Sequence, residues 1–396
     1  MANTAIPAPA EQSDIVEAIA VRNQSVPWYA WTAVIAGTAV IVGLYWDISW
    51  HQTIGRDTFW TPAHLLIQFC AVLGGCGAAY LIFSTTFGRN SSLRDASVTL
   101  WGFRGPVGAF VIAWGGVAMI TSAPFDNWWH NAYGLDVEIL SPPHVLLALG
   151  VTAIVWGSVL LVAAHMNRAE GVAHEKLQWV MLYLGSVIVI LDLILKLEYE
   201  SRVLMHSAVF YLAVCLGLPF AMTSLARASR HRWAMTAIAG MYMGFNLLML
   251  WILPLFPAQP KLGPVYQHVT HMVPLYFPLL LIVPAFVLDL LWPEFDRWQP
   301  WLQAALAGLI FLVVLVAVQW PFADFLMTHY SRNWFFGTHY FGYFQPPDDF
   351  EVRNVFMHFE KSGAQFWRTM AWGLFSAILS FRIGMVWGNW LRQVRR

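Results

Sequence analysis

The chain has 396 residues, of which 58% are hydrophobic and 11% are charged, with a mean hydropathy of +0.56. Soluble domains carry about 25% charged residues, so the composition excludes an ordinary soluble protein. The formal net charge is zero, so the sequence offers no basic surface to a nucleic acid. Twenty-two tryptophans suit the aromatic belts found at the two edges of a lipid bilayer. The composition therefore predicts an integral membrane protein.

Residues 1–27 precede the first apolar run and are expected to form a cytoplasmic N-terminal tail. Three acids, Glu11, Asp14 and Glu17, come before Arg22. A signal peptide would begin with positive charge and end at a small-residue cleavage site, so this segment does not resemble one.

Ten apolar runs follow, each about 17–25 residues long, as a membrane-spanning helix requires. They cover residues 28–47, 62–83, 105–122, 143–164, 177–196, 205–225, 233–255, 271–292, 301–320 and 366–388. The sequence thus predicts an all-α, polytopic membrane protein of about ten transmembrane helices, arranged as repeated helical hairpins. An even number of crossings places both termini on one side of the membrane.

The loops that follow the even-numbered spans, and the C-terminal tail, carry most of the Lys and Arg residues in short loops. Short loops rich in Lys and Arg stay on the cytoplasmic side. We therefore expect cytoplasmic termini, with the loops after odd-numbered spans facing the periplasm of a bacterial inner membrane.

Four parts are expected to follow the tail. Residues 28–164 form a duplicated pair of hairpins that binds metal, and residues 165–320 form the fifth to ninth helices. Residues 321–365 form an outer segment rich in aromatic residues and histidine, and residues 366–396 form the tenth helix and a basic tail.

Histidines are concentrated on the predicted outer side of the membrane. Ten of the thirteen lie at or in the outer loops: His51, His64, His130, His144, His206, His268, His271, His329, His339 and His358. A random distribution would not favour one membrane face so strongly, so these loops are the first place to look for a function.

Two of the outer loops share one pattern. The first has Asp47, His51 and then Thr61-Pro62-Ala63-His64, and the second has Asp126, His130 and then Ser141-Pro142-Pro143-His144. Asp and His four residues apart lie on one face of a continuing helix. Ser or Thr before Pro is typical of a helix start, so the last histidine falls in the first turn of the next helix.

Two imidazoles and one carboxylate on two rigid helix ends can form a facial triad, which leaves coordination positions open on a metal ion. Asp57 and Asp136 are expected to orient the ligating imidazoles. The alternative is that these side chains are solvated loop residues that pair with one another. Repetition of the pattern in a second hairpin favours metal binding, at two sites or at one shared site.

Weaker candidates stand outside the repeat. His268 and His271 lie three residues apart before the eighth span and are expected to share one helix face, as a further metal site or as structural residues. The cysteines Cys70, Cys76 and Cys215 lack the spacing of a zinc site or a disulfide framework, and we interpret them as small core residues.

Residues 46–64, WDISWHQTIGRDTFWTPAH, resemble the metal-binding stretch in one membrane-embedded component of the copper monooxygenases, the family of particulate methane and ammonia monooxygenases. The resemblance implies that Asp47, His51 and His64 bind copper, with Arg56 and Asp57 beside them. Those enzymes are assemblies of three different subunits, and no part of this chain resembles their cupredoxin-like component. The second triad, Asp126, His130 and His144, matches the motif in outline.

Three hypotheses about function follow. The first is a copper-dependent membrane monooxygenase or related oxidoreductase that acts on a small or apolar substrate, with electrons from quinol or from a protein donor. The second is a transporter for copper or another metal, in which Asp192 and Asp289 move ions or protons. The third is a non-catalytic subunit of a membrane complex that binds its partner through residues 321–365. Iron and zinc bind the same kinds of ligand, so they remain alternatives to copper.

Overall fold

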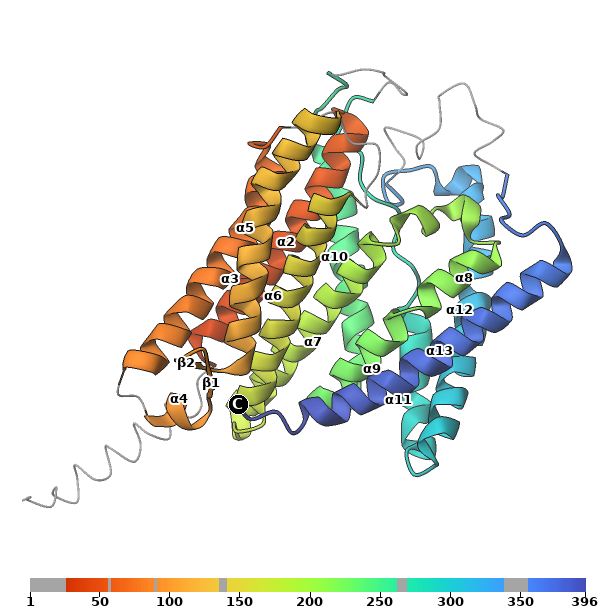
Figure 1. Ribbon diagram of the computed structural model, residues 1–396. Helices are drawn as coiled ribbons and strands as arrows, with labels where there is room; N and C mark the ends of the chain where they lie inside the picture. Colours follow the sequence, from red (N-terminus) through yellow and green to blue (C-terminus); the bar gives the residue numbers. More distant parts are fainter. Residues whose placement is uncertain (1–25, 56–57, 89–90, 135–140, 262–268, 338–354) are drawn as a thin grey trace, which may run out of the picture.

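The computed structural model describes residues 26–55, 58–88, 91–134, 141–261, 269–337 and 355–396 (Figure 1). Within these ranges, nine helices are long and apolar enough to cross a membrane. They are α2 (Trp28–Thr53), α3 (Pro62–Phe87), α5 (Val107–Tyr133), α6 (Pro142–Met166), α7 (Gly171–Ile194), α8 (Ala208–Cys215) continued by α9 (Leu218–Ser229), α10 (Ala234–Ile252), α12 (Pro300–Met327) and α13 (Gly363–Leu391). The predicted all-α, polytopic membrane fold is confirmed.

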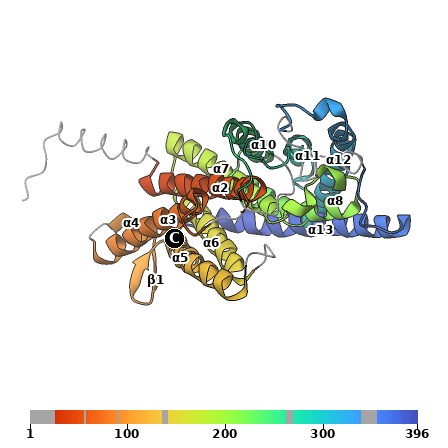
Figure 2. The same cartoon turned by 90° about the horizontal axis from the view of Figure 1, so that it is seen from above.

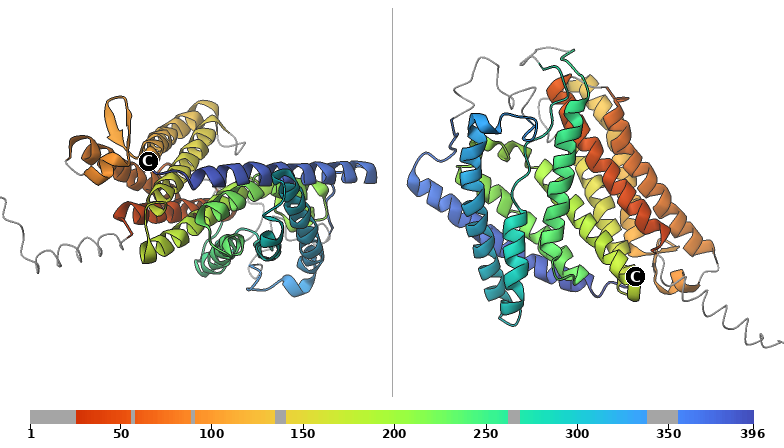
Figure 3. Two further views of the ribbon diagram at one scale, coloured as in Figure 1. Left: turned by 90° about the horizontal axis from the view of Figure 1, so that it is seen from below. Right: turned by 180° about the vertical axis from the view of Figure 1, so that it is seen from behind.

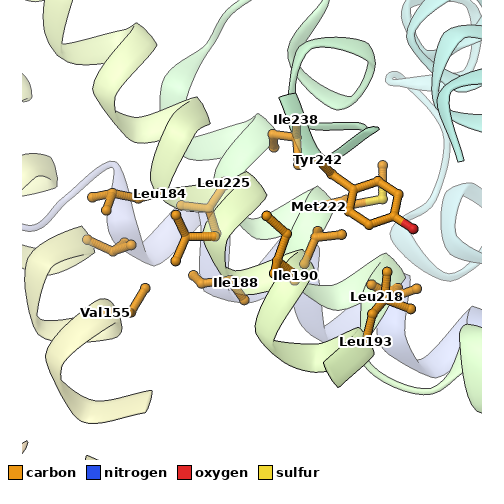
Figure 4. Packing of buried hydrophobic residues seen from close by; sticks show 14 of the residues in the cluster. Val155, Leu184, Ile188, Ile190, Leu193, Leu218, Met222, Leu225, Ile238 and Tyr242 are labelled. Atoms are coloured by element: carbon orange, nitrogen blue, oxygen red, sulfur yellow. The ribbon is translucent and has the colours of Figure 1, made fainter. Parts of the chain in front are cut away.

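The hairpins α2–α3 and α5–α6 lie on one side of α7, and α9 to α13 lie on the other side (Figure 2). The helix α7 contacts α2, α6, α9 and α10, and its apolar side chains are largely buried. Figure 4 shows this packing, in which Leu184, Ile188 and Leu193 of α7 meet Met222 and Leu225 of α9 and Ile238 of α10. Large apolar side chains remain exposed on the outside of the bundle, as contact with lipid requires.

A short two-stranded hairpin between α3 and α5 was not predicted. Strand β1 (Val98–Leu100) pairs antiparallel with β2 (Phe103–Gly105), next to the short helix α4 (Ser91–Asp95). Trp101 and Gly102 form its two-residue turn, and both have positive φ angles, as a type I′ turn needs. The hairpin lies at the end of the bundle where α2 begins and α13 ends (Figure 1).

The prediction of one continuous helix over 271–292 is wrong. Residues 272–280 are extended, and only the fourteen-residue helix α11 (Ile282–Phe295) follows. Pro274 and Pro278 explain the difference, since each lacks an N–H and clashes with the carbonyl four residues earlier in a helix. In Figure 3 α11 occupies only part of the height of the bundle. The eighth crossing is therefore half extended chain and half helix.

Side chains of other helices satisfy the backbone of this extended segment. Val273 N–H donates to Thr53 Oγ1 of α2, Leu279 N–H to Tyr242 Oη of α10, and Leu280 N–H to Gln319 Oε1 of α12. An unpaired backbone amide costs several kcal/mol in a bilayer, so irregular backbone persists there only where protein surrounds it. The three polar side chains supply that environment.

The sixth crossing is also interrupted, between α8 and α9. Gly217 has a φ of +101°, which a residue with a side chain rarely adopts. A Cβ atom there would lie 2.7 Å from Asp192 Oδ1 of α7. The break therefore brings the backbone against the ion pair of Asp192 and Lys196, whose charged atoms are 2.6 Å apart.

The outer segment after α12 packs partly on the chain itself. The helix α12 continues to Met327, seven residues beyond its predicted end. Trp334 stacks on Trp251 of α10, and Phe336 lies against Phe325. Glu360 accepts hydrogen bonds from the start of α8. Several aromatic side chains expected to face a partner thus contact the bundle, while residues 338–354 of this segment, including His339, lie outside the described residues.

Small residues bring α5 and α6 into close contact. A Cβ on Gly108 would lie 2.4 Å from the carbonyl oxygen of Gly157, and a Cβ on Gly115 would lie 2.6 Å from that of Gly150. Membrane helices associate through such close backbone contacts because burial from lipid supplies no hydrophobic driving force. The glycine pairs therefore hold the second hairpin closed below its triad.

Replacing Gly115 with alanine is expected to destabilise the protein by about 1–3 kcal/mol, because the new methyl group forces α5 from α6. Gly75→Ala is the matched control, since its Cβ meets no atom within 4 Å. Thermal unfolding in mild detergent measures both. Equal melting temperatures for the two variants would contradict the proposed packing role.

Candidate metal centre

The first triad forms where α2 ends and α3 begins. Because α2 continues to Thr53, Asp47 and His51 lie one turn apart on it, as predicted. Pro62 occupies the first turn of α3 and places His64 in the same turn. The donor atoms of Asp47, His51 and His64 all lie within 4.8 Å of one another.

The distances within this triad suit one shared cation. His64 Nε2 lies 3.1 Å from Asp47 Oδ1, and His51 Nε2 lies 3.9 Å from Asp47 Oδ2. Donor atoms that bind one ion at about 2.0–2.2 Å lie about 3–3.6 Å from one another. The three side chains are therefore close to a coordinating arrangement.

The orientation of His64 identifies the ring nitrogen that would bind a metal. Its Nδ1 lies 3.0 Å from the carbonyl oxygen of Thr58, an acceptor, so Nδ1 carries the proton. In the neutral ring Nε2 then presents its lone pair toward Asp47 Oδ1, a buried oxygen that accepts no aligned hydrogen bond from the described residues. Two acceptors this close require a proton or a metal ion between them. This donor set fits a metal ion such as copper, zinc or iron.

Thr61 precedes α3 as predicted, but its side chain does not cap the helix. Its Oγ1 instead accepts a hydrogen bond from Thr58 N–H, at 2.9 Å. This contact fixes the loop residue whose carbonyl orients His64. Thr61 thus acts on the triad through Thr58 rather than on the helix end.

The second triad forms in the same way at the neighbouring hairpin. Asp126 and His130 lie one turn apart near the end of α5, and His144 lies in the first turn of α6. His130 Nε2 and His144 Nε2 each lie 3.6 Å from Asp126 Oδ1. Nδ1 of His144 is buried and has no hydrogen-bond partner among the described residues. The second triad is thus similar in composition but lacks the backbone contact that orients His64.

Both triads line one cavity of about 1060 Å³. Its walls come from α2, α3, α5, α6 and α7, and the two triads lie at the same end of the bundle (Figure 1). Most of the wall is apolar, with Leu44, Ile48, Leu147, Val151 and Leu191 among the lining residues. A largely apolar cavity with a few convergent polar groups is typical of a site for a small molecule.

Four amide side chains of the cavity were not predicted. They are Gln52, Gln68, Asn127 and Asn131. Gln52 follows His51 and Asn131 follows His130, so they occupy equivalent positions of the repeat. These equivalent positions could have identified Gln52 and Asn131 from the sequence. No sequence pattern indicated that residues of α7 would form part of the cavity wall.

Several predicted site residues lie elsewhere. Arg56, Asp57, Asp136 and His268 lie outside the described residues, so their predicted roles stay predictions. His271 belongs to the extended eighth segment, where it pairs with Pro257, and is not among the residues that line the cavity.

The cysteines are free thiols, and their predicted burial is only partly correct. Cys70 and Cys215 are buried, but Cys76 is exposed on α3. Its position faces away from the packed side of that helix.

The resemblance of residues 46–64 to the copper monooxygenases stays a prediction. Comparison of the whole chain with models of protein families, with functionally characterised proteins and with solved structures finds no match.

Proposed function

We propose that this chain is a membrane-embedded, copper-dependent oxidoreductase that acts on a small or apolar substrate. The observation that supports this most directly is the convergence of Asp47, His51 and His64 at the edge of a largely apolar cavity. The resemblance of residues 46–64 to the metal-binding stretch of the copper monooxygenases favours copper over iron or zinc. Copper bound at this centre would supply the activation of dioxygen.

The chain's own residues would hold the metal and the substrate. Asp47, His51 and His64 would bind the first ion, and Asp126, His130 and His144 a second ion or part of a shared site. The apolar walls between the hairpins would exclude water and accept a substrate that enters from the bilayer. Gln52 and Asn131 offer hydrogen bonds beside the two triads.

We place the two triads on the periplasmic side of a bacterial inner membrane, because the Lys and Arg residues of short loops favour the opposite side. The sequence contains no motif for a flavin, a nicotinamide or covalent haem attachment. Electrons would therefore come from quinol or from a protein donor, and further membrane proteins are candidate partners.

The purified protein is expected to hold one to two copper ions per chain after reconstitution in mild detergent. Element analysis by mass spectrometry measures copper, iron and zinc together. Oxygen consumption with a reduced quinol and small alkanes or alkenes then tests for turnover. His358→Ala removes an exposed histidine of the outer segment that belongs to neither triad and does not line the cavity. It is the matched control for variants that lose a triad histidine, such as His64→Ala and His144→Ala.

Values of all three metals well below one per chain in the wild type would refute a metalloenzyme. Full copper occupancy without any oxygen consumption would instead favour metal handling or a non-catalytic role in a membrane complex.

A metal transporter is the second candidate, and the interrupted sixth and eighth crossings favour it. Transporters often bind their cargo near the bilayer midplane, at discontinuous helices. The predicted ion-carrying acids have other partners, however: Asp192 pairs with Lys196, and Asp289 accepts hydrogen bonds from Met235 and Thr236 at the start of α10. Copper uptake into sealed proteoliposomes, faster than into empty liposomes, would support transport over oxidation.

A further inference from the structure

A second cavity, of about 440 Å³, lies at the end of the bundle opposite the triads. Residues of α9, α12 and α13 and the residue after α11 surround it. We call it the arginine pocket, after its polar residues Arg227, Asp296, Gln303, Arg382, Asn389 and Gln393. Its composition differs sharply from the apolar cavity of the metal centre.

The helix α13 turns a row of side chains toward this pocket. Arg382, Val386 and Asn389 follow one another at intervals of four and three residues, so they share one helix face, and Gln393 lies just beyond the helix end. Arg382 lies more than two turns inside α13, a helix that crosses the membrane. A charged residue at such a position is costly and usually marks a functional contact.

Arg382 makes few contacts that offset its charge. Its guanidinium lies over the ring of Trp301, 5.5 Å from the centroid. Its Nε is buried and has no hydrogen-bond partner among the described residues. A guanidinium offers five N–H donors, and the ring contact satisfies none of them as a hydrogen bond. Arg382 is therefore available to an anion in the pocket.

Arg227 adds a second guanidinium, which the protein holds in place. It donates to Asp296 Oδ1 at 2.9 Å, to Gln303 Oε1 at 3.1 Å and to Asn389 Oδ1 at 3.4 Å. Its Nε is buried without a hydrogen-bond partner among the described residues. Asp296 is the one carboxylate among the described residues that line the pocket, so two arginines face one negative charge.

The surroundings of the pocket are also positive. Arg392 donates to the backbone carbonyl of Arg227. Burial lowers the pKa of Arg392, and the charges of Arg227 and Arg230 lower it further, while Asp296 acts in the opposite direction. An anion that enters the pocket would relieve this repulsion.

We propose that the arginine pocket binds the phosphate of an anionic phospholipid headgroup. Guanidinium groups bind phosphate through paired, directed hydrogen bonds, and basic pockets between membrane helices are known to bind lipid headgroups. Trp301, Val386 and Trp390 are exposed at or beside the pocket and provide an apolar surface for the acyl chains. That surface favours a lipid over free phosphate.

Native mass spectrometry with titrated lipid tests the proposal on the full chain in mild detergent. The wild type is expected to bind phosphatidylglycerol at least about tenfold more tightly than phosphatidylcholine, or about 1.4 kcal/mol. Arg382→Gln should reduce the affinity for phosphatidylglycerol by about the same factor. Arg368→Gln, an exposed arginine toward the other end of α13, should leave it unchanged.

A second variant keeps the test decisive if Arg382→Gln does not fold. Asn389 is exposed, and Asn389→Asp adds a negative charge to the pocket, so it should also remove the preference for phosphatidylglycerol. A wild-type preference that survives in both variants would overturn the proposal. The lipid assignment would be overturned in favour of a free anion if inorganic phosphate stabilised the wild type as much as the lipid does. That stabilisation would also have to be lost in Arg382→Gln.

Discussion

His64→Ala is expected to lower the affinity of the first triad for copper by about a thousandfold, which corresponds to about 4 kcal/mol. Loss of a residue that only orients a ligand costs about 10–100-fold, and His64 is expected to be a ligand itself. Its hydrogen bond to Thr58 holds Nε2 toward Asp47 before metal arrives, so the substitution removes a pre-oriented donor.

The corresponding variant of the second hairpin, His144→Ala, should remove a weaker site. Asp126 Oδ1 lies 3.6 Å from Nε2 of His130 and 3.6 Å from Nε2 of His144. Nδ1 of His144 lacks a hydrogen-bond partner among the described residues. Competition with a chelator of known copper affinity should therefore show two phases in the wild type. His64→Ala should lose the tighter phase and His144→Ala the weaker one.

His358→Ala should keep both phases, because it removes a histidine from the same chain without touching either triad. If His144→Ala abolishes the tighter phase while His64→Ala retains it, the assignment of the two sites is reversed. A single phase in the wild type that is lost in either single variant would indicate one site shared between the hairpins across the cavity.

Local patterns were enough to predict the triads. The spacing of Asp47 and His51 needed only that α2 continue past its apolar run, and Pro62 and Pro142 marked the starts of α3 and α6. The repeat of this pattern then indicated that both triads lie at one end of the bundle. Each of these features depends on a few neighbouring residues.

The cavity and the interrupted crossings depend on contacts between distant parts of the chain. Leu191 joins the cavity wall only because α7 packs beside both hairpins. Within the eighth apolar run, Pro274 and Pro278 disfavour a helix, but the average hydropathy of the run does not reveal this. Tyr242 and Gln319 make the extended chain stable there, and no local pattern links them to it.

Asp192→Asn is expected to destabilise the protein by about 3 kcal/mol or more, because it leaves the ammonium of Lys196 without its counter-charge. The Asp192 and Lys196 side chains are only 24% and 17% exposed, so water screens the lost charge poorly. Lys196 would keep its hydrogen bond to the carbonyl of Leu216 at the helix break. Thermal unfolding in detergent measures the loss, and the exposed acid Glu198, as Glu198→Gln, is the control.

Glu200 should make this penalty depend on pH. Burial and, to a lesser extent, the charge of Asp192 raise the pKa of Glu200 to about 8, while Lys196 acts in the opposite direction. The folded wild type therefore holds this carboxyl largely neutral at pH 7. In Asp192→Asn the repulsion by Asp192 is gone, so Glu200 ionises at a lower pH than in the wild type and partly compensates Lys196. As the pH rises towards 8.5 the wild type loses stability because Glu200 must ionise beside Asp192, so the penalty of Asp192→Asn should be smaller at pH 8.5 than at pH 6.5.

The double variant Asp192→Asn/Lys196→Met separates loss of an attraction from burial of an unpaired charge. If the main cost of Asp192→Asn is the unpaired ammonium of Lys196, removing that ammonium should make the double variant more stable than Asp192→Asn alone. A double variant that is as unstable as the sum of its single variants would show that the two charges act independently. In that case the helix break at Gly217, where the backbone lies against this pair, would depend on packing and on the hydrogen bond from Gly217 N–H to Ser380 Oγ.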